Sequence, residues 1–171
     1  MGLCQLIRRL IILCADTYGK SFFKELTNRM KNESLIPNYH VSVAKFYGPC
    51  NSKLNRQITV FALLQKFNFF IIVADADGKS QKRVEKTIEC HVSKKLKAST
   101  RFVILEYEIE DWICASKGMC IKGNKPSAIL RQKEGYEKYK LCDYVSQLDI
   151  AKLTKECGSF CRFMECLKAC A

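Results

Sequence analysis

Two carboxylates follow the most apolar segment of the chain. Residues 69–74 read FFIIVA, and Asp75, Ala76, Asp77 and Gly78 come directly after them. A continuous apolar run of this kind is typical of a strand buried on both faces of a parallel sheet. Carboxylates two positions apart across a turn can converge on one hard cation such as Mg²⁺. The same residues also suit a solvated turn that only ends a strand, and both interpretations stay open here.

Further acidic residues stand after two other predicted strands. Asp16 follows the strand expected at 8–14, and the strand expected at 101–107 leads to Glu106, Glu108, Glu110 and Asp111. Because parallel strands bring their carboxyl ends to one edge of a sheet, we expect these acids to lie near Asp75 and Asp77. A buried acidic cluster without a cation repels itself. The sequence therefore predicts a site for Mg²⁺, or for Mn²⁺ in its place.

The elements that must position these acids alternate between strand and helix. Residues 80–96, for example, place Val84, Ile88, Val92 and Leu96 on one face of a charged helix. Such alternation predicts an α/β fold, with a parallel, doubly wound sheet of about four strands flanked by helices. The strands are expected at 8–14, 39–47, 69–74 and 101–107, the helices at 21–33, 54–67 and 80–96, and a turn at 16–20.

The pattern changes beyond Trp112, which we expect to pack in the core rather than to stack on a base. A lysine-rich loop follows, and a helical cap is expected to close the sheet. Its helices are predicted at 126–132, 146–156 and 158–169. We therefore expect residues 1–115 to form the α/β core, and residues 116–171 to form a loop and helical extension packed on the same domain.

Positive charge dominates the 171 residues, whose formal net charge is +12. A basic surface attracts phosphate-rich partners, although charge of this size also simply keeps a protein in solution. Because the basic residues coexist with an acidic metal-type motif, we expect nucleic acid as the partner, with DNA preferred to RNA. The lysine-rich loop would hold it through Lys117, Lys122 and Lys125. Lys20 and Lys79 could neutralise charge on a reacting phosphate, or be ordinary surface lysines.

Cysteine is unusually frequent, with 11 residues, and there are 2 histidines. No two cysteines have the C-x-x-C spacing, which argues against a zinc ribbon or finger. We expect buried, reduced thiols. The alternative is a disulfide between the C-terminal helix and the body, for example through Cys114 or Cys120, as in intracellular proteins of hyperthermophiles.

No apolar run approaches the roughly 20 residues that cross a membrane. The uncharged segment 10–15 is shorter than the apolar region of a secretory signal, and Leu6 stands where a myristoylation signal has Ser or Thr. We therefore expect a cytoplasmic protein that makes no membrane contact. Its oligomeric state stays open.

Three motifs carry a resemblance to a known family, namely VADADG at 73–78, EYEIEDWICA at 106–115 and KPSA at 125–128. They resemble the Toprim fold of topoisomerases, bacterial primases and the OLD (overcoming lysogenization defect) nucleases. More closely, the motifs resemble small stand-alone Toprim-like proteins related to OLD nucleases, and the resemblance covers about residues 8–167. The resemblance implies that Asp75 and Asp77 bind Mg²⁺ and that Glu110 lies near the metal. Asp16, followed by Thr17, stands where Toprim proteins have a Glu followed by Gly, the proposed general acid or base.

The resemblance implies phosphoryl transfer on nucleic acid, most closely by a Mg²⁺-dependent Toprim-type nuclease with Asp16, Lys20 and Lys79 in catalytic roles. Because the ATPase domain of OLD proteins is not found in these residues, an ATP-coupled role would need a separate ATPase partner. The alternative is a non-catalytic Toprim-like module that binds nucleic acid or a partner, with Asp16 marking lost chemistry. Haloacid-dehalogenase phosphatases and response-regulator receivers also carry paired acids. They fit less well, because their acids follow the first strand.

Overall fold

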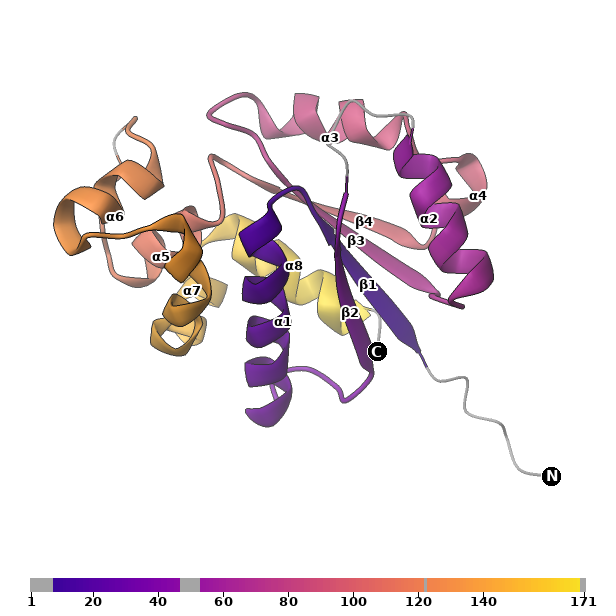
Figure 1. Ribbon diagram of the computed structural model, residues 1–171, viewed down its shortest axis with the longest axis horizontal. Helices are drawn as coiled ribbons and strands as arrows, with labels where there is room; N and C mark the ends of the chain where they lie inside the picture. Colours follow the sequence, from indigo (N-terminus) through magenta and orange to yellow (C-terminus); the bar gives the residue numbers. More distant parts are fainter. Residues whose placement is uncertain (1–7, 47–52, 122, 170–171) are drawn as a thin grey trace.

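Four parallel strands form one sheet between layers of helices in the computed structural model (Figure 1). The structure describes residues 8–46, 53–121 and 123–169. The strands lie in the spatial order β2-β1-β3-β4. The predicted α/β fold with a four-stranded parallel sheet flanked by helices is therefore confirmed. The strands are β1 (Arg9–Cys14), β2 (His40–Lys45), β3 (Phe69–Asp75) and β4 (Thr100–Leu105).

The two central strands, β1 and β3, are buried on both faces. Along β1, Leu10 and Ile12 belong to one hydrophobic cluster, and Ile11 and Leu13 belong to another on the opposite face. Alternate residues of a strand point to opposite sides of the sheet, so each side needs its own apolar cover. This double burial explains why both central strands are almost uninterrupted apolar runs.

The first helical layer covers the face of Ile11 with α2 (Lys53–Leu64), α3 (Gln81–Glu89) and the short α4 (Lys94–Lys97). The prediction of one helix over residues 80–96 is wrong, because the chain leaves the helix between α3 and α4. The Ser93 N–H donates to Asn55 Oδ1 of α2 at 3.0 Å. The contact with α2 therefore replaces a helical hydrogen bond while the apolar face stays buried.

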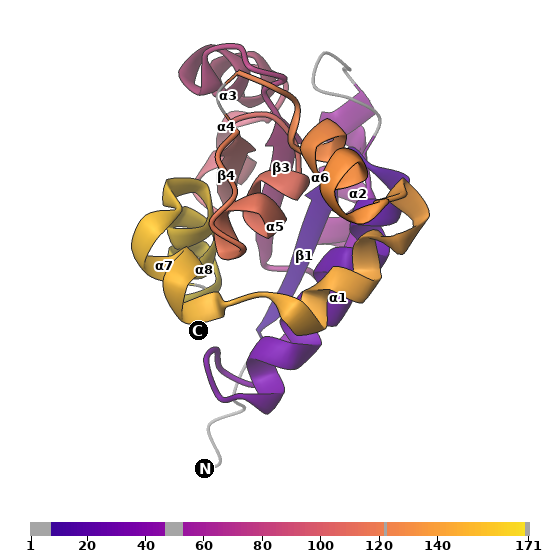
Figure 2. The same cartoon turned by 90° about the vertical axis from the view of Figure 1, so that its left-hand side faces the viewer.

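The second layer covers the opposite face and includes the C-terminal region (Figure 2). Trp112 is fully buried among four phenylalanine rings, with ring centroids 4.9–6.3 Å from its own. The expected core role of Trp112 is confirmed, and Ser159 Oγ accepts its ring N–H at 2.9 Å. The elements of this layer are α1 (Thr17–Asn32), α5 (Glu110–Ser116), α6 (Pro126–Glu134), the 3₁₀ helix η1 (Lys138–Gln147), α7 (Ile150–Glu156) and α8 (Gly158–Ala169).

Helix α1 begins one residue after Asp16, so the prediction of a turn at 16–20 is wrong. Gly19, which favoured a turn in the sequence, lies in the first turn of the helix instead. A Cβ atom at Gly19 would stand 2.9 Å from Ile109 Cδ1. Glycine at this position therefore leaves room for the Ile109 side chain where α1 approaches the start of α5.

The structure also bears on the predictions about disulfides and membrane spans. All eight described cysteines are free thiols, so the alternative of a disulfide through Cys114 or Cys120 is wrong. Within the described ranges, every helix is too short or too polar to cross a bilayer. Leu6 and Lys122, to which two other predictions refer, lie outside the described residues.

Candidate functional site at the carboxyl edge of the sheet

The loop after β3 is held in a defined shape beside the end of β4. The Gly78 N–H donates to the Glu106 carbonyl at 2.9 Å, and a Cβ atom at Gly78 would stand 2.9 Å from the Tyr107 ring. Asp77 has φ 50° and Gly78 has φ 74°, values that aspartate tolerates better than most residues and glycine adopts freely. This turn leaves Asp75 half-buried at the strand end, whereas Asp77 is exposed.

Asp16 combines two roles at the start of α1. Its Oδ1 accepts the Tyr18 N–H at 2.7 Å, which caps the helix. Its Oδ2 forms an ion pair with Lys138 Nζ at 2.8 Å. The helix cap fixes this carboxylate at the edge of the sheet, so the second oxygen is presented to the site.

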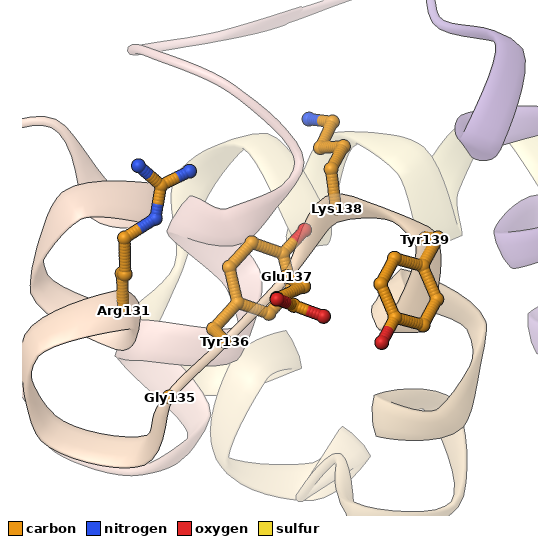
Figure 3. A pocket seen from close by; sticks show the side chains of 6 residues that line it. All are labelled: Arg131, Gly135, Tyr136, Glu137, Lys138 and Tyr139. Atoms are coloured by element: carbon orange, nitrogen blue, oxygen red, sulfur yellow. The ribbon is translucent and has the colours of Figure 1, made fainter.

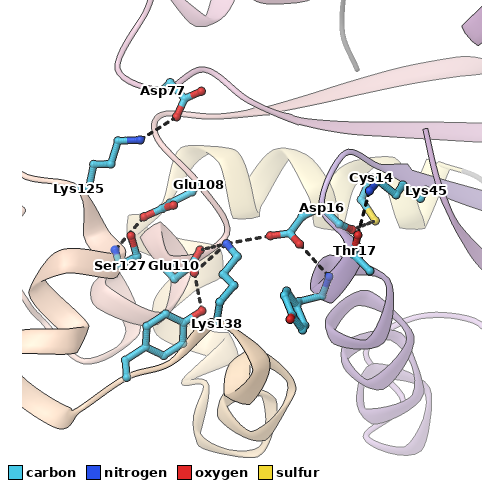
Figure 4. A network of polar contacts seen from close by, with 12 residues as sticks. Cys14, Asp16, Thr17, Lys45, Asp77, Glu108, Glu110, Lys125, Ser127 and Lys138 are labelled. Carbon is cyan, nitrogen blue, oxygen red and sulfur yellow. Dashed lines mark hydrogen bonds and ion pairs between the residues drawn. The ribbon is translucent and has the colours of Figure 1, made fainter. Parts of the chain in front are cut away.

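Glu110 is the most deeply buried acid of the site, with a side chain that is 0% exposed. Lys138 Nζ donates to its two carboxylate oxygens at 2.8 and 3.0 Å, and the Tyr136 hydroxyl donates to Oε1. Lys138 therefore bridges Glu110 and Asp16, as Figure 4 shows at its centre. One lysine from the C-terminal region joins acids that follow the first and fourth strands.

Asp75 has a pKa raised to about 7. Burial is the main cause, and the charge of Lys138 opposes it. The negative charges of Asp16, Asp77 and Glu110 raise the pKa further. Acids from three separate segments therefore act on one another at this edge, as the strand ends predicted.

The pKa values of Lys138 and Tyr136, the two partners of Glu110, are both raised. Burial alone would lower the pKa of Lys138, but the charge of Glu110 and the hydrogen bond to Asp16 outweigh it, so the pKa is raised. Burial and the hydrogen bond to Glu110 raise the pKa of the Tyr136 hydroxyl. Both groups therefore keep their protons and stabilise the Glu110 carboxylate.

The other acids near the fourth strand hold loops in place. Glu108 accepts the Ser127 N–H at 2.8 Å at the start of α6. Asp111 Oδ2 accepts the Tyr107 N–H at 2.7 Å, while Oδ1 is buried without a hydrogen-bond partner in the described structure. Burial raises the pKa of Asp111 to about 6. Glu106 is exposed.

The lysines predicted to bind nucleic acid are placed differently from one another. Lys125 Nζ reaches Asp77 Oδ1 at 3.3 Å, so this part of the loop faces the acidic edge. Lys117 pairs instead with Glu134 at 2.7 Å, within the C-terminal region. Lys20 and Lys79 are both exposed, the former in the first turn of α1 and the latter just before α3.

Two hollows flank the site. One, of about 400 Å³, is lined by Tyr136 and Lys138 together with Arg131, Glu137 and Tyr139, and Figure 3 shows Lys138 extending away from Tyr139. The other, of about 590 Å³, is lined by Asp75, Asp77, Lys79 and residues of α3. The second hollow therefore gives access to Asp75 and Asp77, and the first reaches Lys138.

The fit of a divalent cation depends on Lys138. Carboxylate oxygens are the ligands that Mg²⁺ prefers, and Asp16, Asp75, Asp77 and Glu110 supply them. Across residues 8–46, 53–121 and 123–169, however, no three His, Cys, Asp or Glu side chains are grouped so that they could hold a metal ion. Asp16 and Glu110 already share the positive charge of Lys138. The residue types fit Mg²⁺, but Asp16 and Glu110 could bind the ion only if Lys138 moved away from them.

Sequence reasoning missed Tyr136 and Lys138, which it treated only as part of the helical extension. Lys138 lies 28 positions after Glu110, so no local spacing connects them. Arg83, which lines the second hollow, was also missed, because the sequence shows it only as one of many charges on a helix. Comparison of the chain with protein-family models, curated proteins and solved structures gives no match.

Proposed function

We propose that the protein performs Mg²⁺-dependent phosphoryl transfer on nucleic acid, most closely as a Toprim-type nuclease. The observation that carries the proposal is the environment of Asp75. Burial and the like charges of Asp16, Asp77 and Glu110 raise its pKa to about 7 even though Lys138 is near. A divalent cation at this edge, Mg²⁺ or Mn²⁺, would relieve that repulsion.

The chain's own residues take distinct roles in this proposal. Asp75, Asp77 and Glu110 would hold the metal, which when bound polarises the phosphodiester and activates a water molecule. Tyr136 keeps Glu110 Oε1 in place through its hydroxyl. Asp16 Oδ2, which faces Lys138 Nζ, would accept or return the proton of the attacking group.

The Toprim resemblance supports the proposal through position as well as sequence. Asp75 and Asp77 follow the third strand, and Glu110 is the first residue of the helix after the fourth. The net charge of +12 supports nucleic acid as the substrate, with DNA preferred to RNA. A separate ATPase partner remains part of the proposal for any ATP-coupled role.

The test is cleavage of supercoiled plasmid and of labelled single strands with Mg²⁺, Mn²⁺ or chelator, by the wild type and by Asp75→Asn. Asp143→Asn is the matched control, because it makes the same change at an exposed position of η1. We expect metal-dependent cleavage that Asp75→Asn lowers by about 100-fold or more and Asp143→Asn leaves intact. Equal activity of the three proteins would refute the proposal.

One observation favours a second candidate, a non-catalytic module that binds nucleic acid or a partner. Lys138 already bridges Asp16 and Glu110, and such a built-in cation can serve structure in place of a metal. Titration calorimetry separates the two candidates. A wild type that binds nucleic acid, takes up no Mg²⁺ or Mn²⁺ and cleaves nothing would support the module.

A further inference from the structure

A cleft of about 590 Å³ opens on the side of Asp75 that faces α3. Its volume is in the range of sites that hold small ligands or single groups of larger ones. Acidic, basic and hydroxyl side chains line it together. The residues that matter are Asp75, Asp77, Lys79, Ser80, Arg83 and Thr87.

The basic side chains of this cleft are not compensated. Lys79 and Arg83 are exposed, and neither forms an ion pair within the part of the chain that the structure describes. The acids are placed differently, because Asp77 pairs with Lys125 at 3.3 Å and Asp75 interacts with the charge of Lys138. Two positive charges therefore face the cleft without an acid of their own.

The donors of the cleft come from one short segment of the chain. Lys79 comes just before α3 and Arg83 lies in its first turn, and Ser80 between them is the N-cap residue, whose hydroxyl makes no capping hydrogen bond. The Lys79 N–H donates to the Ala76 carbonyl at 2.9 Å, which fixes the backbone beside the acidic loop. A guanidinium fork, an ammonium group and a hydroxyl are a donor set that suits phosphate oxygens.

We propose that this cleft binds phosphate, in the form of a phosphodiester of the nucleic-acid strand that reaches the edge of the sheet. The inference rests on the proposed function for the identity of its substrate. Arg83 from α3 and Lys79 from the residues just before it contact the phosphate oxygens, and the nucleic-acid strand continues toward Asp75. Thr87 also lines the cleft, but its hydroxyl donates to the Arg83 carbonyl at 3.0 Å and is therefore not assigned to the phosphate.

The experiment measures binding of a fluorescein-labelled single strand by anisotropy, with chelator present so that no divalent cation takes part. The variants are Lys79→Gln and Arg83→Gln. Lys82→Gln is the matched control, because Lys82 lies on the same helix, is exposed and does not line the cleft. Circular dichroism confirms that each variant is folded.

We expect Lys79→Gln and Arg83→Gln each to weaken binding by about tenfold. Each should also lower the slope of log affinity against log salt concentration by about 1. Lys82→Gln should keep its affinity within about twofold, because it removes only diffuse charge. Equal losses in all three variants, or no loss at Lys79 and Arg83, would overturn the inference.

Competition with inorganic phosphate and with adenosine monophosphate identifies the source of the phosphate. Weak displacement by these compounds, beside much tighter binding of the strand, supports the phosphodiester. If a phosphate compound displaces the strand and binds as tightly as the strand does, and if Arg83→Gln abolishes this binding, the cleft recognises phosphate and its ligand is a free phosphate compound. No displacement by any phosphate compound, with strand binding unchanged in the variants, refutes the site.

The chelator separates this inference from the proposed function. The first outcome is that the variants bind the strand weakly in chelator while the wild type cleaves nothing under any condition. This outcome supports the phosphate cleft and refutes the nuclease. Cleavage that depends on Asp75 but not on Lys79 or Arg83, with unchanged strand affinity, supports the nuclease and refutes the cleft.

Discussion

The two sides of Asp75 handle charge in opposite ways. On the Lys138 side, formed by Asp16, Glu110, Tyr136 and Lys138, each charged group has a partner at hydrogen-bonding distance. On the α3 side, formed by Asp77, Lys79, Ser80 and Arg83, the two basic side chains are exposed and have no ion-pair partner among the described residues. Acidic and basic side chains therefore form a network of paired charges on one side and line an open cleft on the other.

This difference separates structural charge from charge that is free to bind a ligand. A buried charge must be compensated within the protein, and removing its partner is costly. An exposed charge is hydrated, contributes little to folding and can exchange water for a ligand. We therefore expect substitutions on the Lys138 side to change stability, and substitutions on the α3 side to change binding.

Replacing Lys138 with Met should cause the largest loss of stability. The change leaves Glu110, which is 0% exposed, and Asp16 without their shared cation. We expect the free energy of unfolding, measured with urea, to fall by about 3 kcal/mol. Mg²⁺ should restore more stability to this variant than to the wild type if the acids can bind it.

Lys140→Met is the control for Lys138→Met. Lys140 is exposed, and its nearest acid, Glu137, is 3.9 Å away. Its replacement should change stability by less than about 0.5 kcal/mol. Equal effects of the two lysines would show that Lys138 is also a surface charge, and the contrast between the two sides would fail.

Replacing Asp75 with Asn should stabilise the protein above neutral pH. The pKa of Asp75 is raised from 3.8 to about 7. The native state therefore binds this proton more readily than the unfolded chain, so stability falls as pH rises from about 4 to about 7. Asn removes this loss, and we expect a gain of about 4 kcal/mol near pH 8 and almost none near pH 4.

Urea unfolding across pH measures the effect of Asp75→Asn. Asp143→Asn, at an exposed position, should leave the pH dependence unchanged. A gain of the same size at every pH would mean that the Asp75 carboxylate is not the group responsible. Loss of cleavage together with higher stability would be the pattern expected of a strained functional residue.

Replacing Tyr136 with Phe should have a smaller effect on the same side. The change removes the hydroxyl donor to Glu110 Oε1 but leaves Lys138 in place. We expect a loss of about 1–2 kcal/mol in the free energy of unfolding. Tyr139→Phe is the control, because Tyr139 is 62% exposed, and it should change little. A larger loss at Tyr139 would contradict the assignment.

The sequence predicted the acidic edge because strands carry a strong local pattern. The apolar run of β3 ends at Asp75, and parallel strands place Asp16 and Glu110 at the same edge. Helix ends were harder to predict. Gly19 favoured a turn in the sequence, but in the structure it lies inside α1, where the Ile109 side chain packs closely against it. Helix α3 ends at Glu89, and the Ser93 N–H beyond it donates to Asn55 of α2, a contact that no local pattern predicts.

Lys138 could not be predicted in this way. It lies 28 positions from Glu110 in the sequence, and the sequence does not show which of the many lysines pairs with this buried acid. Only the packing of the C-terminal region against α1 and α5 selects it. The partner of a buried acid is therefore known only from the folded structure, whereas the position of the acids at the edge of the sheet can be predicted from the ends of the strands.

Replacing Lys125 with Gln should have the smallest effect and gives the sharpest contrast with Lys138. Both lysines pair with acids of the edge, but the side chains of Lys125 and Asp77 are 62% and 57% exposed at a separation of 3.3 Å. Solvent and salt screen such a pair, so we expect a change in the free energy of unfolding below about 0.5 kcal/mol. Urea unfolding at low and high salt measures it. A loss close to that of Lys138→Met would show that pairing alone, rather than burial, decides which charges hold the fold together.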